Sequence, residues 1–141
     1  MMPQPDPTAR HVFVYGTLRS GGSNDISRFS PAPQRVGDGE IAGTLFDLGA
    51  YPGAVLGGGG RIKGEVYRIA PGVEVQLDLL EEVKPDGSGE YIRREVEVEV
   101  AGRSIACLVY EIHPSRIAGR SVIASGNWMA RDRGSGSLFM P

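Results

Sequence analysis

Three carboxylates lie close together in the segment 77–82, whose sequence is Leu-Asp-Leu-Leu-Glu-Glu. The spacing of Leu77 and Leu80 predicts a helix whose leucines face the core, and Glu81 is expected beside that buried stripe. Burial, a neighbouring carboxylate and the negative end of a helix dipole all raise the pKa of a carboxyl group. A carboxyl group with a raised pKa can act as a general base, so Glu81 is a candidate acid/base residue. The residues alone also fit a solvated acidic helix end that Lys84 neutralises.

A possible anion-binding loop follows the first apolar segment of the chain. The β-branched and aromatic residues at 12–15 predict a strand, which gives way to glycine and small polar residues at 16–22. The end of such a strand leaves backbone N–H groups unpaired and directed at one point, where they can hold a carboxylate or a phosphate. A plain strand followed by a glycine turn explains the same residues. The residues that would form the pocket are Tyr15, Gly16, Thr17 and Leu18.

Other candidates for chemistry are few. Tyr91 and Arg93 begin an alternating segment, so a strand would place both side chains on one face, where they could line a polar pocket. Tyr91 could equally belong to the core, and Arg93 could pair with a glutamate on a neighbouring strand. Cys107 lies inside an apolar segment and no G-x-S-x-G motif occurs, so nothing favours a nucleophilic mechanism. His11 and His113 are the two histidines, too few to predict a metal site.

Length and composition indicate one globular domain. The chain has 141 residues, of which 40% are hydrophobic and 23% charged, as is typical of a domain with one core. A formal net charge of −2 gives no basic surface for nucleic acid or an anionic membrane. No apolar run could span a membrane, and the prolines near the N-terminus interrupt any signal-peptide core. We expect a cytoplasmic protein with a mobile arm at 1–10, a domain at 11–130 and a loosely held tail at 131–141, of unknown oligomeric state.

The elements that must position these residues are mostly strands. Strands are predicted at 11–15, 40–48, 54–56 and 61–69, with Gly57–Gly60 forming a hairpin turn between the last two. Pro71 should begin a helix that ends near Val83. The strictly alternating segment 91–100 then turns into a partner strand at 104–112. About six strands and a single good helix predict an α+β fold, a small mixed or antiparallel β-barrel with flanking short helices.

Five short motifs occur in a characteristic order along the chain. They are Tyr15-Gly16-Thr17-Leu18-Arg19, Gly43-Thr44-Leu45-Phe46-Asp47-Leu48-Gly49 with Tyr51-Pro52, Gly64-Glu65-Val66-Tyr67, Leu77-Asp78-Leu79-Leu80-Glu81 and Tyr91-Ile92-Arg93. In order and approximate spacing these motifs resemble the γ-glutamylcyclotransferase-like (AIG2-like) family. Ser125-Gly126-Asn127-Trp128 is similar to that family's closing Gly-Asp-Trp element, so the resemblance extends from His11 to about Trp128.

The resemblance implies a small barrel and a cyclisation reaction. In that reaction the α-amine of a γ-glutamyl group attacks its own side-chain carbonyl, which yields 5-oxoproline and a free amine or amino acid. By the resemblance, Tyr15–Leu18 hold the glutamyl moiety and Glu81 is the general acid/base. The chemistry requires no metal or cofactor. The chain departs from the family pattern at Glu82, where glycine is usual, and at Asn127, where aspartate is usual and for which we expect a structural role.

The sequence therefore predicts a cofactor-independent γ-glutamyl cyclotransferase that acts on a γ-glutamyl amine or a γ-glutamyl peptide. Its predicted site comprises Glu81, the Tyr15–Leu18 loop, Tyr91 and Arg93. An alternative hypothesis is a catalytically silent binding module that uses the same pocket for a small carboxylate or a peptide. A hydrolase with a catalytic serine or cysteine is a third hypothesis, for which the sequence offers no motif. The leaving group is not predicted, because pocket walls made by loops decide it.

Overall fold

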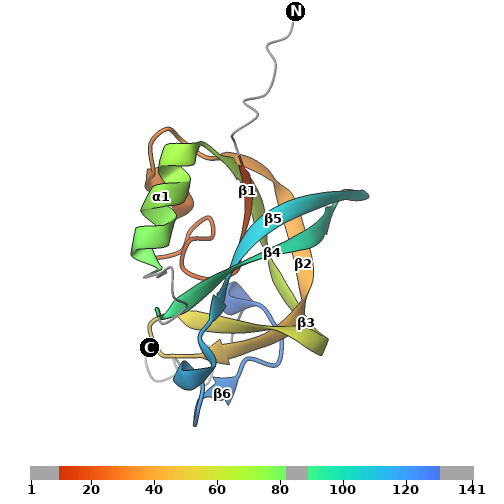
Figure 1. Cartoon of the computed structure of the whole chain (residues 1–141). Coiled ribbons are helices and arrows are strands. Elements are labelled where there is room, and N and C mark those ends of the chain that lie inside the picture. Colours follow the sequence, from red (N-terminus) through yellow and green to blue (C-terminus); the bar gives the residue numbers. More distant parts are fainter. Residues whose placement is uncertain (1–9, 82–88, 131–141) are drawn as a thin grey trace, which may run out of the picture.

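The computed structural model describes residues 10–81 and 89–130 of the chain (Figure 1). The predicted arm, except for Arg10, and the predicted tail lie outside the described residues. The strands are β1 (Arg10–Val14), β2 (Gln34–Asp47), β3 (Pro52–Ile69), β4 (Tyr91–Val100), β5 (Arg103–Ile112) and β6 (Ser121–Val122). The α-helix is α1 (Pro71–Leu80), and short 3₁₀ turns occupy Ile26–Arg28, Pro114–Arg116 and Trp128–Ala130.

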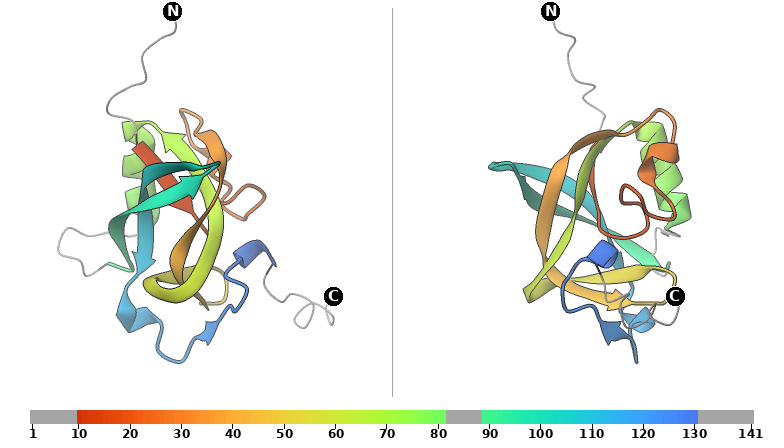
Figure 2. Two further views of the ribbon diagram at one scale, coloured as in Figure 1. Left: turned by 90° about the vertical axis from the view of Figure 1, so that its right-hand side faces the viewer. Right: turned by 180° about the vertical axis from the view of Figure 1, so that it is seen from behind.

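Five strands close into a barrel. β3 pairs antiparallel with both β1 and β2, and β2 meets β4 where Glu40 lies opposite Glu99. β4 and β5 form a long antiparallel hairpin. A parallel contact between Val12 and Leu108 joins β5 to β1 and completes the ring, while β6 extends the sheet at β2. The closed ring, visible from two further directions in Figure 2, confirms the predicted α+β barrel.

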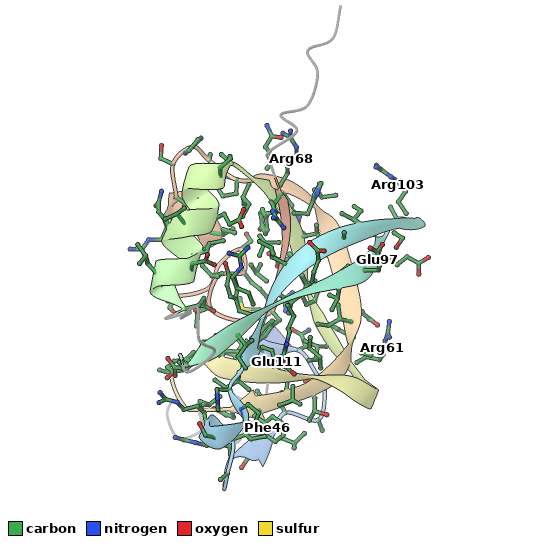
Figure 3. All side chains as sticks on the ribbon, in the orientation of Figure 1. Phe46, Arg61, Arg68, Glu97, Arg103 and Glu111 are labelled. Atoms are coloured by element: carbon green, nitrogen blue, oxygen red, sulfur yellow. The ribbon has the colours of Figure 1, made fainter. Side chains whose placement is uncertain are left out.

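The β4–β5 hairpin is confirmed in detail. Val98 and Val100 are buried, whereas the alternating Glu95, Glu97 and Glu99 form an exposed face. At the turn, Ala101 and Gly102 have φ values of 51° and 81°, the left-handed pair that a two-residue hairpin turn requires. The tip of the hairpin projects from the barrel, and Figure 3 shows Glu97 and Arg103 close to it.

The prediction of a hairpin at Gly57–Gly60 is wrong. β3 is one continuous strand, and its pairing with β2 passes from Arg61 directly to Leu56 between two consecutive residues of β2. The four glycines are therefore an insertion in β3, a large irregular bulge rather than a hairpin turn. Two of them, Gly57 and Gly58, have positive φ values of 92° and 82° that other residues rarely adopt. The chain reverses instead at 48–51, between β2 and β3.

α1 is shorter than predicted and packs on the outside of the barrel. It begins at Pro71 as expected but ends at Leu80, with Glu81 as its C-cap. Its buried residues are Val73 and Leu77, whereas Leu79 is 75% exposed, so the expectation that all its leucines face the core is wrong. The reason is that a helix lying on a barrel buries one narrow stripe. No helix within 10–81 and 89–130 is long and apolar enough to cross a membrane.

The hydrophobic core has two parts, which place α1 relative to the barrel. The first fills the barrel interior around Phe13, Leu45 and Val109. The second lies between the barrel wall and α1, where Leu77 packs among residues such as Ile112. Figures 1 and 2 both show the segment between β1 and β2 beside α1. The loop after β1 and the end of α1 are thereby brought to one side of the molecule.

Candidate active site

A single cavity collects most of the predicted site residues. It has a volume of ≈ 360 Å³ and lies where the loop after β1, the end of α1 and the start of β4 meet. The Tyr15–Leu18 loop, Glu81 and Tyr91 all line it, although they are far apart in the sequence. The remaining lining residues are Phe13, Val14, Ser23, Asn24, Ala50, Tyr51, Pro52, Leu80, Glu90 and Tyr110.

The Tyr15–Leu18 loop offers unpaired backbone donors to this cavity. The N–H of Arg19 donates to the carbonyl of Gly16 at 3.0 Å, and the N–H of Asn24 donates to the carbonyl of Thr17 at 2.9 Å. These bonds close the loop into tight turns and occupy the carbonyl oxygens of Gly16 and Thr17. Within the described part of the chain, the N–H groups of Gly16, Thr17 and Leu18 donate to no acceptor. They are available to an anionic or carbonyl oxygen of a ligand.

A buried ion pair holds the far side of the same loop. Glu65 is only 5% exposed and accepts hydrogen bonds from Arg19 Nε at 3.1 Å and from the N–H of Ser20 at 2.9 Å. The hydroxyl of Tyr67 donates to the same carboxylate at 2.9 Å. Asn127 Oδ1 accepts a hydrogen bond from the Arg19 guanidinium at 2.7 Å, which agrees with the structural role expected for it. Charge-assisted bonds in a buried setting hold their partners firmly, so this network fixes the loop's position.

Sequence reasoning did not single out Glu65 for this role, although the residue lies within one of the quoted motifs. The local pattern carried no signal for this role, because β3 also contains Lys63 and Arg68 near this position. The partners of Glu65 could not be identified, since they come from distant segments.

Glu81 lies in the cavity wall at the C-terminal end of α1. Burial raises the pKa of its carboxyl group to about 7, and the nearby carboxylate of Glu90 adds to the rise. No side chain or backbone donor in the described residues forms a hydrogen bond with the Glu81 carboxylate. A carboxyl group that titrates near neutrality can both accept and return a proton, as acid–base catalysis requires.

Three tyrosines surround Glu81, but their hydroxyl protons are directed elsewhere. The hydroxyls of Tyr15 and Tyr91 donate to backbone carbonyls at 2.5 Å and 2.7 Å. The hydroxyl of Tyr110 donates to Asp78 Oδ1 at 2.7 Å. None of these protons stabilises the carboxylate of Glu81, so hydrogen bonds from the three phenols do not lower its pKa.

Arg93 is placed away from the cavity. Its guanidinium forms ion pairs with Glu74 at 2.5 Å and with Asp78 at 2.7 Å, both on α1. The predicted contact between Arg93 and a substrate therefore finds no support in this arrangement. Tyr91, its neighbour on the same face of β4, does line the cavity.

The other sequence candidates do not add to the site. The described ranges contain no group of three or more histidine, cysteine, aspartate or glutamate side chains that could hold a metal ion. Cys107 is buried in the barrel, and burial raises the pKa of its thiol to about 12, so it is protonated at neutral pH. Glu82, which departs from the family pattern, lies outside the described residues.

Comparisons with known proteins agree with this geometry. A family model described as gamma-glutamyl cyclotransferase, AIG2-like, matches residues 12–130. The chain is 37% identical over 123 residues to the gamma-glutamylcyclotransferase family protein YtfP of Escherichia coli (strain K12), covering 86% of this chain and 98% of that protein. It is 33% identical over 91 residues to the gamma-L-glutamyl-butirosin B gamma-glutamyl cyclotransferase of Niallia circulans, covering 64% and 57% of the two chains.

A solved structure of a relative shows the same fold. The solution NMR structure of ytfP from Escherichia coli superposes with a TM-score of 0.61 at 36% identity, covering 86% of this chain and 98% of that one. Sequence and fold thus agree over nearly all of the described residues. The chain belongs to the gamma-glutamyl cyclotransferase, AIG2-like family.

Proposed function

We propose that the protein is a γ-glutamyl cyclotransferase that releases 5-oxoproline from a γ-glutamyl amine or a γ-glutamyl peptide. The observation that carries the proposal is the meeting of two parts in one cavity: Glu81, with a pKa of about 7, and the unpaired N–H groups of the Tyr15–Leu18 loop. Membership of the family supports the same class of reaction. A cavity of ≈ 360 Å³ is within the usual range for small-molecule sites.

Glu81 moves the proton in this mechanism. The α-ammonium of the γ-glutamyl group must lose a proton before its nitrogen can attack, and the carboxylate of Glu81 accepts that proton. A bond then forms between this nitrogen and the side-chain carbonyl carbon, while the bond from that carbon to the leaving nitrogen breaks. The protonated Glu81 returns that proton to the leaving nitrogen. The attacking nitrogen loses its second proton as it becomes an amide, and the released amine takes up this proton and leaves as an ammonium ion, so that atoms and charges balance with no other reactant.

The loop orients the substrate for this attack. The N–H groups of Gly16, Thr17 and Leu18 bind oxygen atoms of the γ-glutamyl group and stabilise negative charge that develops on them. A substrate held in the cavity in a folded shape, with the amine near its own carbonyl, gains from proximity in the attack. The buried Glu65–Arg19 pair behind the loop keeps these donors fixed.

The proposal is tested by incubating the protein with γ-glutamyl amines and γ-glutamyl dipeptides and measuring 5-oxoproline and the released amine. We expect both products in equal amounts from at least one compound. Thermal unfolding with the same compounds tests the alternative of a silent binding module, which would be stabilised by a ligand without forming product. Failure to turn over any compound in the panel would contradict the proposal.

Replacing Glu90 with glutamine should shift the pH dependence of the reaction. The negative charge of Glu90 opposes ionisation of Glu81, so its removal lowers the pKa of Glu81 below about 7. The basic form of Glu81 then persists in more acidic solution, and the acidic limb of kcat/KM moves to lower pH by about 0.5–1 unit. The measurement is kcat/KM over roughly pH 5 to 9, on both sides of the titration of Glu81. The matched control is Glu99→Gln, which removes an exposed carboxylate from the other end of β4 and should leave the profile unchanged.

A further inference from the structure

The last turn of α1 packs on the barrel through one fully buried apolar side chain, Leu77. The buried residues of the helix are Val73 and Leu77. Beyond them, Leu79 is 75% exposed and Leu80 is 42% exposed. A helix of 10 residues is too short to be stable by itself. Polar contacts therefore add to Leu77 in fixing the turn that leads into Glu81.

Arg93 makes contacts of this kind. It lies on β4, in the barrel wall, and its guanidinium reaches Glu74 at 2.5 Å and Asp78 at 2.7 Å. These two carboxylates are one turn apart on α1, and their side chains are only 15% and 25% exposed. Ion pairs in such a partly buried setting are stronger than pairs at the surface. Tyr110, on β5, adds a hydrogen bond of 2.7 Å to Asp78.

We infer that Arg93 is a positioning residue, which holds Glu81 in the cavity by clamping the last turn of α1 to β4. The position of Asp78 affects that of Glu81 through the helix backbone. The N–H of Glu81 donates to the carbonyl of Leu77 at 2.9 Å, and Leu77 is the residue before Asp78. Without Arg93, the ion pair of Glu74 with Arg10 at 3.5 Å would only partly offset the repulsion between the carboxylates of Glu74 and Asp78 along the helix face. The turn would then keep the buried Leu77 and the hydrogen bond from Tyr110 but lose its ion pairs to β4. This inference deepens the proposed function and rests on it for its consequence in catalysis.

The ionisation of Glu81 reports its position even without a substrate. In the cavity its pKa is about 7, whereas a solvated glutamate has a pKa of about 4.3. Release of the turn into solvent would therefore lower the pKa. Loss of a positive charge alone would act in the opposite direction and raise it. The titratable side chains that face Glu81 from the neighbouring segments are Tyr15, Glu90, Tyr91 and Tyr110.

The first test is a carbon-13 NMR titration of the Glu81 carboxyl group in the full chain, with its signal identified by its loss in Glu81→Gln. In Arg93→Gln we expect the pKa of Glu81 to fall by about one unit or more. Arg93→Lys keeps the charge but lacks the two guanidinium nitrogens that bond Glu74 and Asp78 at the same time, so a smaller fall in the pKa of Glu81 is expected. An unchanged or raised pKa in Arg93→Gln would overturn the inference. If Arg93→Gln does not fold, a pKa in Arg93→Lys equal to that of the parent protein would overturn it.

The matched control is Arg94→Gln. Arg94 is the next residue of the same strand, and it pairs at 2.8 Å with the partly buried Glu111 of β5, away from α1. Its replacement removes the same charge and a comparable ion pair, yet should leave the pKa of Glu81 as it is. A fall of equal size in Arg94→Gln would show a general loosening of β4 and would also overturn the inference.

Steady-state kinetics separates positioning from substrate binding. Arg93→Gln should lower kcat by about 10–100-fold, because a small displacement of a catalytic group is costly, while KM changes by less than about threefold. A large rise in KM with kcat intact would instead show that Arg93 contacts the substrate. If the parent protein forms no 5-oxoproline, the proposed function fails, but the NMR titration still decides whether Arg93 holds Glu81 in place.

Discussion

Replacing Glu81 with glutamine is expected to reduce the rate of 5-oxoproline release by about 10²–10⁴-fold, the usual contribution of a general acid–base residue. Glutamine keeps the size and polarity of the side chain but cannot accept the proton of the α-ammonium. The Tyr15–Leu18 loop is untouched, so KM should change little. The measurement is kcat and KM for 5-oxoproline formation, with thermal unfolding to show that the variant still binds its substrate.

The matched control for this variant is Glu97→Gln. Glu97 lies on the exposed face of β4, so its replacement makes the same chemical change outside the cavity and should leave the rate unchanged. Full activity in Glu81→Gln would show that another group transfers the proton. The cavity would then require a different assignment of its acid and base.

The parts of the fold that depend on local pattern were predictable from sequence. The alternation of valine and glutamate in β4 fixes which face is buried, and a turn of small residues then fixes the hairpin with β5. The glycine run at 57–60 is different, because four glycines permit a turn and a bulge equally. What decided between the two was the pairing of both halves of β3 with β2, which is a long-range property that local residues do not contain.

The same division applies to the site. The place of Glu81 beside the buried stripe of α1 could be predicted because its spacing from Leu77 is a property of one helix, whereas its acid/base role was only implied by the family resemblance. The role of Arg93 could not, because sharing a face with Tyr91 does not reveal that α1 covers that part of the face. The partners of Arg19 were equally hidden, since Glu65 and Asn127 lie 46 and 108 positions away from it.

The pKa of Glu81 also has a consequence for stability. Its folded-state pKa of about 7 lies above the unfolded value of about 4.3, so the folded protein binds the proton more tightly. Below the unfolded pKa, where both states are protonated, Glu81 has no effect on the free energy of unfolding. As the pH rises from about 4.3 to about 7, the buried carboxylate increasingly destabilises the fold, and the effect is complete above about 7.

Glu81→Gln should therefore stabilise the protein in alkaline solution and not in acid. The expected gain at about pH 8 is at most on the order of 4 kcal/mol, and it should disappear near pH 4. Urea unfolding of both proteins at the two pH values measures the difference. A gain in unfolding free energy of the same size at both pH values would mean that improved packing, not ionisation, is responsible. A loss at alkaline pH would contradict the raised pKa of Glu81, and with it the reason for assigning this residue the proton transfer.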